Sequence, residues 1–209
     1  MKNNEKAIKI GSLNCFNIKT HWKDIEADDK LLKADIVNFQ ETWLCANEED
    51  FFQLESYYSI FSSDGNGKGV ATYSKDLICD EKRVKEHGLY IISVEFKTIR
   101  IINVYRSIMG SDILLLEFIR DTLRSEERSI IVTGDLNICF NKTPKQRLFK
   151  GMKELGFQQL VTEPTHVKGG TIDHIYWLDR RCEWEDPNIE RYSPYYSDHD
   201  ALLVTLRRR

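Results

Sequence analysis

Short stretches of alternating or continuous apolar residues, separated by polar turns, run through most of the chain. Residues 6–14 (KAIKIGSLN) alternate with a period of two, as in a half-buried β-strand. The pair Lys97-Thr98 separates two apolar runs, which predicts an antiparallel hairpin. We predict strands over residues 6–14, 36–40, 70–74, 89–96, 99–104, 129–133, 171–178 and 201–206.

Apolar residues at helical spacing predict three helices between these strands. The first runs from Trp22 to Leu32, the second starts at Asp112, and the third spans residues 145–155 and ends before Gly156. Strands interleaved with a few helices indicate a layered α/β fold, in which sheets pack against each other with helices outside.

The composition is that of an ordinary soluble domain. The 209 residues are 41% hydrophobic and 30% charged, with a mean hydropathy of −0.45. This length suits one domain with a large core, so we expect a single domain over residues 1–209, which could be excised from a larger protein. No apolar run approaches the roughly 18 residues of a membrane-spanning helix, so no membrane partner is expected.

The first six residues are polar and lack the apolar core of a signal peptide. The five cysteines are odd in number and widely spaced, which argues against a disulfide framework or a zinc cluster and predicts an intracellular, reducing location. The net charge of −3 offers no global attraction to nucleic acid, so DNA binding would depend on a local basic rim.

Carboxylate, amide and imidazole side chains lie where several predicted strands end. Glu41 and Asp135 each follow a strand, and Asp-His pairs occur at 173–174 and 198–199. Hydrolysis of a phosphodiester needs a divalent ion held by oxygen ligands, a positioned water and donors for negative charge. Taken singly, Glu41 could equally be a solvated charge and Asn14 could complete a turn. Together, these groups predict metal-assisted phosphoryl chemistry.

Six short motifs occur in a specific order along nearly the whole chain. They are SLNCFN, NFQETWL, NVYRS, TGDLN, GGTIDHI and SDHDAL, and together they resemble the endonuclease/exonuclease/phosphatase superfamily. The resemblance implies a four-layered α/β sandwich, in which two packed, mostly antiparallel sheets are flanked by helices. It also implies a Mg²⁺-dependent phosphodiesterase, with Mn²⁺ as the alternative ion.

The resemblance further implies the residues of the site. Glu41 would be the principal metal ligand, Asp198 would assist it, and Asn14 matches the first motif of the metal site. His174 would lie on the opposite face of its strand from Asp173, so we expect it to be structural. The implied catalytic set comprises Tyr105, Asp135, Asn137, Asp173 and His199.

Each member of the catalytic set has an implied role. Asp135 would orient or activate the attacking water, Asn137 would hold water and phosphate, and Tyr105 would contact the scissile phosphate or the leaving group. Asp173 would orient His199, because an imidazole held by a carboxylate keeps its orientation and its proton. Whether His199 acts as a base or as an electrophile stays open.

Departures from the family pattern narrow the function. Many nucleases of this family have Tyr-x-Pro-Asn where this chain has residues 105–108 (YRSI), so Arg106 or Ser107 would supply the missing phosphate donor. Phe16 replaces a polar residue of several members, which puts a second metal position in doubt. The Trp-Cys-Asp-Arg segment of inositol phosphatases is missing, and Gly170 replaces the bulky aromatic residue of abasic-site endonucleases.

The segment TEPTHVKGGTIDHIYW especially resembles endonuclease domains of non-LTR retrotransposons. Such domains nick one DNA strand and leave a 3′-hydroxyl that primes reverse transcription. We therefore predict a DNA-nicking endonuclease, nuclear if it belongs to a eukaryotic mobile element. The alternatives are a phosphatase acting on inositol or lipid phosphates and a catalytically silent nucleic-acid-binding module. The oligomeric state is not predicted.

Contacts to DNA phosphates require Lys and Arg side chains near the site. The candidates lie in the tyrosine motif, after the TGDLN strand and in the turn over residues 167–170. They are Arg106, Lys142, Lys145, Arg147, Lys150 and Lys168. Each of them could equally be a solvated surface charge.

Overall fold

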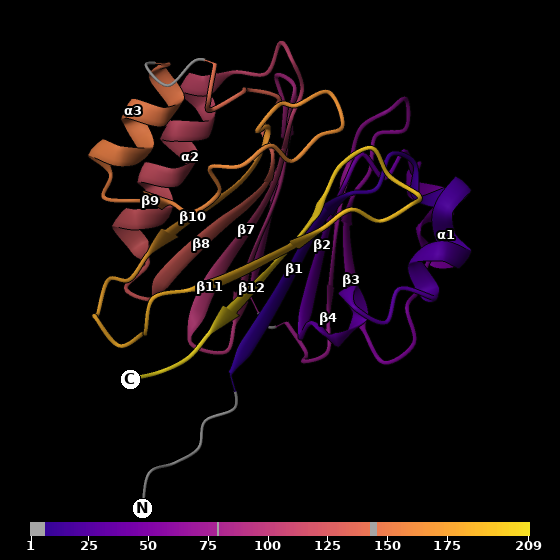
Figure 1. The fold of residues 1–209 in the computed structure, drawn as a ribbon, viewed down its shortest axis with the longest axis horizontal. Helices are drawn as coiled ribbons and strands as arrows, with labels where there is room; N and C mark the ends of the chain where they lie inside the picture. Colours follow the sequence, from indigo (N-terminus) through magenta and orange to yellow (C-terminus); the bar gives the residue numbers. More distant parts are fainter. Residues whose placement is uncertain (1–6, 79, 143–145) are drawn as a thin grey trace, which may run out of the picture.

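The computed structural model describes residues 7–209, except for residue 79 and residues 143–145 (Figure 1). Its strands form two six-stranded sheets that pack face to face. The predicted layered α/β sandwich is confirmed, and so is its mostly antiparallel pairing, because each sheet contains a single parallel pair.

The first sheet has the strand order β11-β12-β1-β2-β4-β3, and its parallel pair is β1 with β2. Its strands are β1 (Ile8–Asn14), β2 (Ile36–Gln40), β3 (Tyr58–Ser62), β4 (Val70–Ser74), β11 (Asn188–Tyr192) and β12 (Ala201–Leu206).

The second sheet has the strand order β5-β6-β7-β8-β10-β9, and its parallel pair is β7 with β8. Its strands are β5 (Glu81–Glu86), β6 (Leu89–Phe96), β7 (Ile99–Arg106), β8 (Ser129–Asp135), β9 (Gln158–Gln159) and β10 (Asp173–Leu178).

Helices cover the outer face of each sheet. Helix α1 (Ile18–Glu26) lies outside the first sheet, whereas α2 (Asp112–Ser125) and α3 (Arg147–Glu154) lie side by side outside the second (Figure 1). Three apolar clusters follow from this layering, one between the sheets and one beneath the helices on each side. Burial of these three clusters holds the four layers together.

The predicted strands are all present, and four further strands were missed. Two of the missed strands, β5 and β11, are mainly exposed edge strands with polar sequences, so their apolar periodicity is weak. The second helix starts at Asp112 as predicted, and Gly156 follows the third helix with a positive φ of 88°, as a C-terminal glycine does.

The prediction for the first helix was wrong in its boundaries. It begins at Ile18, where the Asn17 side chain accepts a hydrogen bond from the Lys19 N–H, and it ends at Glu26. Asp28 then accepts the N–H of Leu31, which begins a short 3-10 turn over Leu31–Lys33. A side chain that bonds to the backbone in this way ends the α-helix before the predicted apolar spacing does.

Buried amides link the two sheets directly beneath one end of the sandwich. Gln40 donates from Nε2 to Oδ1 of Asn103 at 2.7 Å, and Asn103 donates in turn to the carbonyl of Ala71 at 2.9 Å. All three residues are fully buried. Such a network fixes how the two sheets are aligned on each other, and it thereby fixes the positions of the ends of β2 and β7.

Candidate active site

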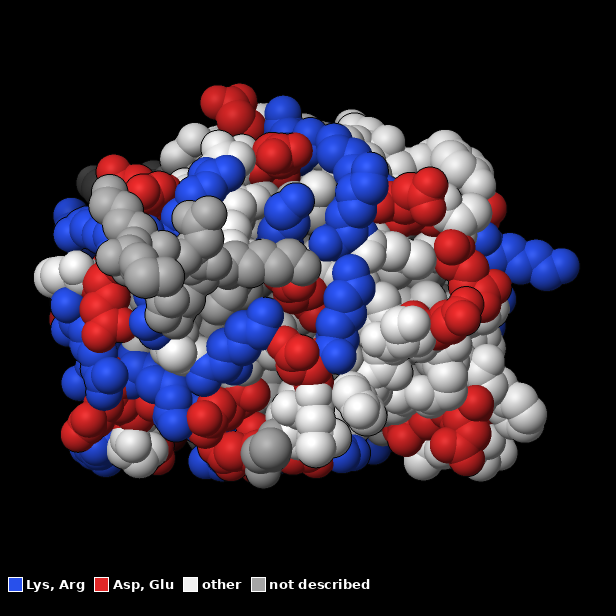
Figure 2. All heavy atoms as spheres, turned by 90° about the horizontal axis from the view of Figure 1, so that it is seen from below, with Lys and Arg blue, Asp and Glu red and all other residues white. Residues whose placement is uncertain are grey.

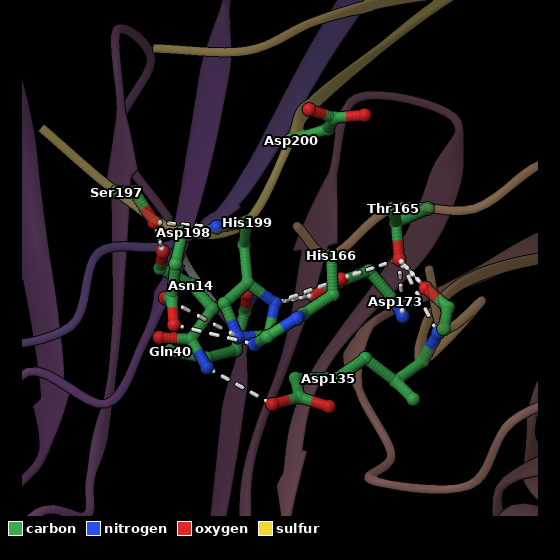
Figure 3. A network of polar contacts seen from close by, with 12 residues as sticks. Asn14, Gln40, Asp135, Thr165, His166, Asp173, Ser197, Asp198, His199 and Asp200 are labelled. Atoms are coloured by element: carbon green, nitrogen blue, oxygen red, sulfur yellow. Dashed lines mark hydrogen bonds and ion pairs between the residues drawn. The ribbon is translucent and has the colours of Figure 1, made fainter. Parts of the chain in front are cut away.

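Asp135, Asp173 and His199 form a buried cluster where the two sheets meet (Figure 3). Asp135 ends β8 and lies directly opposite Asp173, which begins β10. His199 comes from the other sheet, just before β12, and its Nδ1 lies 2.9 and 3.1 Å from the two carboxylate oxygens of Asp173. The predicted pairing of Asp173 with His199 is therefore present in the structure.

Thr165 holds Asp173 in place and was missed by the sequence analysis. Its hydroxyl donates to Asp173 Oδ2 at 2.6 Å and accepts the backbone N–H of Asp173 at 3.1 Å and of Ile172 at 3.2 Å. Thr165 is completely buried. Thr165 lies eight residues before Asp173, in the segment TEPTH. This position in the sequence would indicate the contact with Asp173 only if the geometry of the loop were already known.

Ser197 joins the loop that carries His199 to the end of β1. Its hydroxyl donates to the Asn14 carbonyl at 2.7 Å and accepts the His199 N–H at 3.0 Å. The same loop is fastened to the turn that follows α1, because the hydroxyls of Tyr192 and Tyr196 both donate to Asp28 at 2.7 Å. The imidazole of His199 thus rests on a tethered loop.

Asn14 connects the two carboxylates that come from different sheets. Its Nδ2 donates to Glu41 Oε1 at 3.1 Å and to Asp135 Oδ2 at 2.9 Å, while its Oδ1 accepts the N–H of Phe16 at 3.1 Å. The Phe16 contact fixes the amide with its nitrogen towards the carboxylates. This orientation does not favour Asn14 as a metal ligand, because its nitrogen and not its oxygen faces the carboxylates. The metal-ligand role of Asn14 stays a prediction.

Glu41 lies just beyond β2 on a backbone with a positive φ of 53°. Its other oxygen, Oε2, accepts the indole N–H of Trp43 at 3.3 Å, and Trp43 also has a positive φ of 57°. Non-glycine residues in this region are strained, and such strain concentrates at functional sites. Sequence reasoning did not single out Trp43 as a residue that holds Glu41.

The turn after β8 is built around Asp135. Asn137 donates its backbone N–H to Asp135 Oδ1 at 2.8 Å and its side-chain amide to the Arg106 carbonyl at 3.0 Å. Gly134 has φ 136°, and a Cβ there would lie 1.9 Å from the Val104 carbonyl oxygen. Only glycine lets β8 approach β7 this closely.

Tyr105 lies near the end of β7 and is 7% exposed. Burial raises the pKa of its hydroxyl well above the usual range, and the negative charges of Glu41 and Asp135 raise it further. The hydroxyl therefore remains a proton donor at neutral pH.

The cluster perturbs the protonation of both partners of Asp173. Burial, followed by the negative charge of Asp173, raises the pKa of Asp135 to about 8, although His199 and the Asn137 N–H oppose the shift. Burial alone would lower the pKa of His199, but the charge and hydrogen bonds of Asp173, with Asp135 and Asp198, raise it to about 9. The surrounding carboxylates thus favour the imidazolium form of His199.

The acidic residues of the site fit a divalent cation. Asp135 and Asp173 face each other across the strands with donor atoms within 4.8 Å, and Asp198 Oδ1 is buried without a hydrogen-bond partner. Carboxylate oxygen donors of this kind suit Mg²⁺ or Mn²⁺. Among the described residues, two groups of three have donor atoms within 4.8 Å of one another, and Glu41 belongs to neither.

Arg106 is buried, although we predicted it as a DNA contact. Its Nε lies 2.8 Å from Asp112 Oδ1, and its Nη1 donates to the carbonyls of Leu136 at 3.1 Å and Ser107 at 3.2 Å. Only 6% of the residue is exposed. This buried position does not favour contact with a DNA phosphate, which stays a prediction. In the structure, Arg106 holds the turn after β8.

The other predicted DNA contacts lie on the surface, with one exception. Lys142, Arg147, Lys150 and Lys168 are exposed, and Arg147 and Lys150 line a groove between α2 and α3. Lys145 lies outside the described residues.

The end of the molecule that lies opposite the candidate active site carries interleaved charges of both signs (Figure 2). Arg208, near the C-terminus, lies there beside Glu183 at 3.8 Å and over the ring of Trp184. Other ion pairs at this end include Lys97 with Asp76, Arg100 with Glu126, Arg128 with Glu95 and Arg181 with Glu127.

His174 faces away from the cluster, as predicted from the strand pleat. Its Nδ1 contacts Gln159 Nε2 at 2.6 Å and its Nε2 contacts the Ile138 carbonyl at 2.9 Å. The ring stacks on Tyr176 with a centroid distance of 5.8 Å. These contacts belong to the layer beneath α2 and α3.

Residues 17–199 match the model of the Endonuclease/Exonuclease/phosphatase family. The chain belongs to this family. It is a family of metal-dependent nucleases and phosphatases, which agrees with the acidic site. A comparison with curated protein sequences finds no significant match. No helix among the described residues has the length and apolar character needed to cross a membrane.

Solved structures of the family share this fold at low sequence identity. The 3′ phosphatase NExo from Neisseria, bound to a product DNA hairpin, aligns with a TM-score of 0.76 at 19% identity over 97% of this chain and 100% of its own. An AP endonuclease from Archaeoglobus fulgidus aligns with a TM-score of 0.69 at 19% identity over 94% of this chain and 98% of its own. The endonuclease domain of TRAS1, a telomere-specific non-LTR retrotransposon, aligns with 0.69 at 16% identity over 97% of this chain and 99% of its own.

Proposed function

We propose that the protein is a divalent-metal-dependent endonuclease that hydrolyses a phosphodiester bond of DNA and leaves a 3′-hydroxyl. The observation that carries this proposal is the buried cluster of Asp135, Asp173 and His199, joined through Asn14 to Glu41. The cluster combines a carboxyl of raised pKa, a charged imidazole and further carboxylates at one point. Phosphodiester hydrolysis needs these groups together.

Asp135 is suited to take a proton from the attacking water. Its two oxygens are held by the Asn137 N–H and by Asn14 Nδ2, which fix the direction of the remaining lone pairs. In its deprotonated form, which a bound divalent cation would favour, a carboxyl of raised pKa is a stronger base than an ordinary carboxylate.

His199 is suited to donate a hydrogen bond to a phosphate oxygen. Asp173 holds Nδ1 and its proton, so Nε2 carries the second proton of the imidazolium and remains directed into the site. This assignment makes His199 an electrophile, the alternative left open by the sequence. Tyr105, whose hydroxyl stays protonated, offers a second donor from β7.

Glu41 and Asp198 are the residues that we expect to hold the metal ion. A bound Mg²⁺ or Mn²⁺ would supply a Lewis acid for a phosphoryl oxygen. Trp43 keeps Glu41 directed towards Asn14 and Asp135, so the carboxylate reaches the site already oriented.

The biological role that we propose is nicking of target DNA for a mobile element, with a nuclear location if the host is eukaryotic. The retrotransposon-like segment TEPTHVKGGTIDHIYW and the likeness in fold to the TRAS1 endonuclease domain support this role. Exposed Lys142, Arg147, Lys150 and Lys168 would contact the DNA backbone.

Plasmid nicking tests the proposal. Supercoiled DNA would be incubated with wild type, His199→Ala and the surface control His87→Ala, with Mg²⁺, with Mn²⁺ or with a chelator. We expect open circles that polymerase can extend, formed by wild type and His87→Ala only, and only with metal. The same proteins would be offered a 3′-phosphorylated DNA hairpin and inositol phosphates. Phosphate release from either substrate, without nicking, would replace the endonuclease by a phosphatase.

A further inference from the structure

His166, which lies outside the six family motifs and was given no role, lies against Asp198 and His199 (Figure 3). Its Nε2 is 3.2 Å from Asp198 Oδ2, and its ring meets the His199 ring edge-on with a centroid distance of 4.6 Å. The side chain is 11% exposed, so it lies inside the site and not on its rim.

The backbone around His166 leaves little freedom for the ring. His166 pairs with His199 in an antiparallel bridge, and the Val167 N–H donates to the Asp198 carbonyl at 3.0 Å. The His166 N–H and the Thr165 N–H both donate to the Gly170 carbonyl, which closes the turn. The turn over residues 165–170 and the Asp198-His199 segment are therefore joined directly by backbone hydrogen bonds.

A backbone hydrogen bond decides which ring nitrogen of His166 carries the proton. The Lys168 N–H donates to Nδ1 at 3.0 Å, so Nδ1 must offer a lone pair and the proton of the neutral ring is on Nε2. A protonated Nε2 has no lone pair for a metal ion. Although His166, Asp198 and His199 have donor atoms within 4.8 Å of one another, His166 is placed to donate to Asp198 and not to coordinate.

The two oxygens of Asp198 consequently differ. Oδ2 accepts from His166, whereas Oδ1 is buried without a hydrogen-bond partner and lies 3.8 Å from His199 Nε2. Asp198 itself is partly exposed, with 37% of its side chain accessible, so without His166 the carboxylate could turn outward. The contact with His166 keeps Oδ1 directed into the site.

We propose that His166 is a positioning residue that donates from Nε2 to Asp198 Oδ2 and thereby presents Oδ1 to the metal ion or to the reacting group. The inference rests on the proposed hydrolytic function for its catalytic consequence, but the tautomer and the contact are properties of the protein alone. Partners of this kind, one contact removed from the metal, commonly change metal affinity or activity about 10–100-fold when removed.

The first test is independent of activity. Long-range ¹H–¹⁵N spectra of the imidazoles in the metal-free protein should show His166 as the Nε2–H tautomer, and Asp198→Asn should shift its Nε2 resonance. A Nδ1–H tautomer, or loss of the Nε2 proton through direct ligation on adding diamagnetic Zn²⁺, would overturn the proposal. This result stands even if no substrate is ever cleaved.

The second test separates a positioning role from a structural one. His166→Ala should raise the Mg²⁺ concentration for half-maximal cleavage, or lower kcat, by about 10–100-fold, with KM for DNA little changed. His166→Gln, whose amide can donate to Asp198, should recover most of the loss, and Val167→Ala, in the same turn with an exposed side chain, should match wild type. Calorimetric titration with Mg²⁺ in the absence of DNA should show the same order of affinities.

The variants also distinguish failure of this inference from failure of the proposed function. A folded His166→Ala protein that binds Mg²⁺ and cleaves DNA as wild type does would overturn the positioning role alone. A wild type that cleaves none of the substrates would overturn the proposed function, whereas the tautomer and the Mg²⁺ titration would still decide the role of His166.

Discussion

Protonation of His174 is expected to destabilise the folded protein at acidic pH. The buried ring is satisfied when neutral, because Nδ1 accepts from the Gln159 amide at 2.6 Å and Nε2–H donates to the Ile138 carbonyl at 2.9 Å. Burial therefore lowers the pKa of His174 from 6.5 to about 4, although the Ile138 carbonyl and Asp173 oppose the shift.

The direction and size of the effect follow from linkage. The unfolded chain binds a proton at His174 near its ordinary pKa of 6.5, whereas the folded chain does so only near 4. The stability that the neutral ring provides is fully present above pH 6.5 and is lost as the pH falls through about 4. At about 1.36 kcal/mol per pKa unit, the loss is about 3 kcal/mol of unfolding free energy.

Urea unfolding between about pH 7.5 and pH 4 measures this loss. His174→Gln keeps a donor for the Ile138 carbonyl but does not titrate, and His87→Gln, at an exposed position, is the control. The difference in unfolding free energy between wild type and His174→Gln should shrink by about 3 kcal/mol over this range. A difference that stays constant with pH would refute the reasoning, whereas His87→Gln should follow wild type throughout.

Three further substitutions test other parts of the site. Asp173→Asn should lower single-turnover cleavage about 10²–10⁴-fold in a folded protein, because His199 loses the carboxylate that keeps its proton; near-normal cleavage would contradict the assignment. Gly134→Ala should cost more than about 3 kcal/mol of unfolding free energy, since its Cβ meets the Val104 carbonyl oxygen, and a wild-type melting curve would show that β8 can shift. Thr165→Val should cost about 1–3 kcal/mol by leaving two backbone N–H groups unpaired, and Thr165→Ser, which keeps the hydroxyl, should not.

The pattern of apolar residues along the chain predicted the central strands well, because these strands lie between two other layers of the structure. The strands β6, β7 and β8 are buried between the other sheet and the helices, so nearly every position in them is buried and most are apolar. The edge strands β5 and β11 are held by pairing with a neighbour and keep exposed polar side chains. Their sequences carry no period that distinguishes them from loops.

Contacts between distant segments explain what the sequence missed at the site. The motifs identified Asp173 and His199, but Thr165 and His166 act through hydrogen bonds that depend on how one turn packs against another. A polar residue in a loop has no periodicity to reveal such a role. Arg106 is an example of the opposite error. Its positive charge near the predicted phosphate site suggested a DNA contact, but its side chain bonds to Asp112 and to two backbone carbonyls.

The two Asp-His pairs of this chain look alike in sequence and differ because of their backbones. In β10 the pleat sends neighbouring side chains to opposite faces, so Asp173 enters the site while His174 packs beneath the helices. Asp198 and His199 precede β12 and are not bound by that alternation, so both can turn inward. A strand can thus contribute only one member of such a pair to a site, and the second pair had to come from a loop. That loop requires fastening by other residues, which is the part played by Ser197 and by the turn that carries His166.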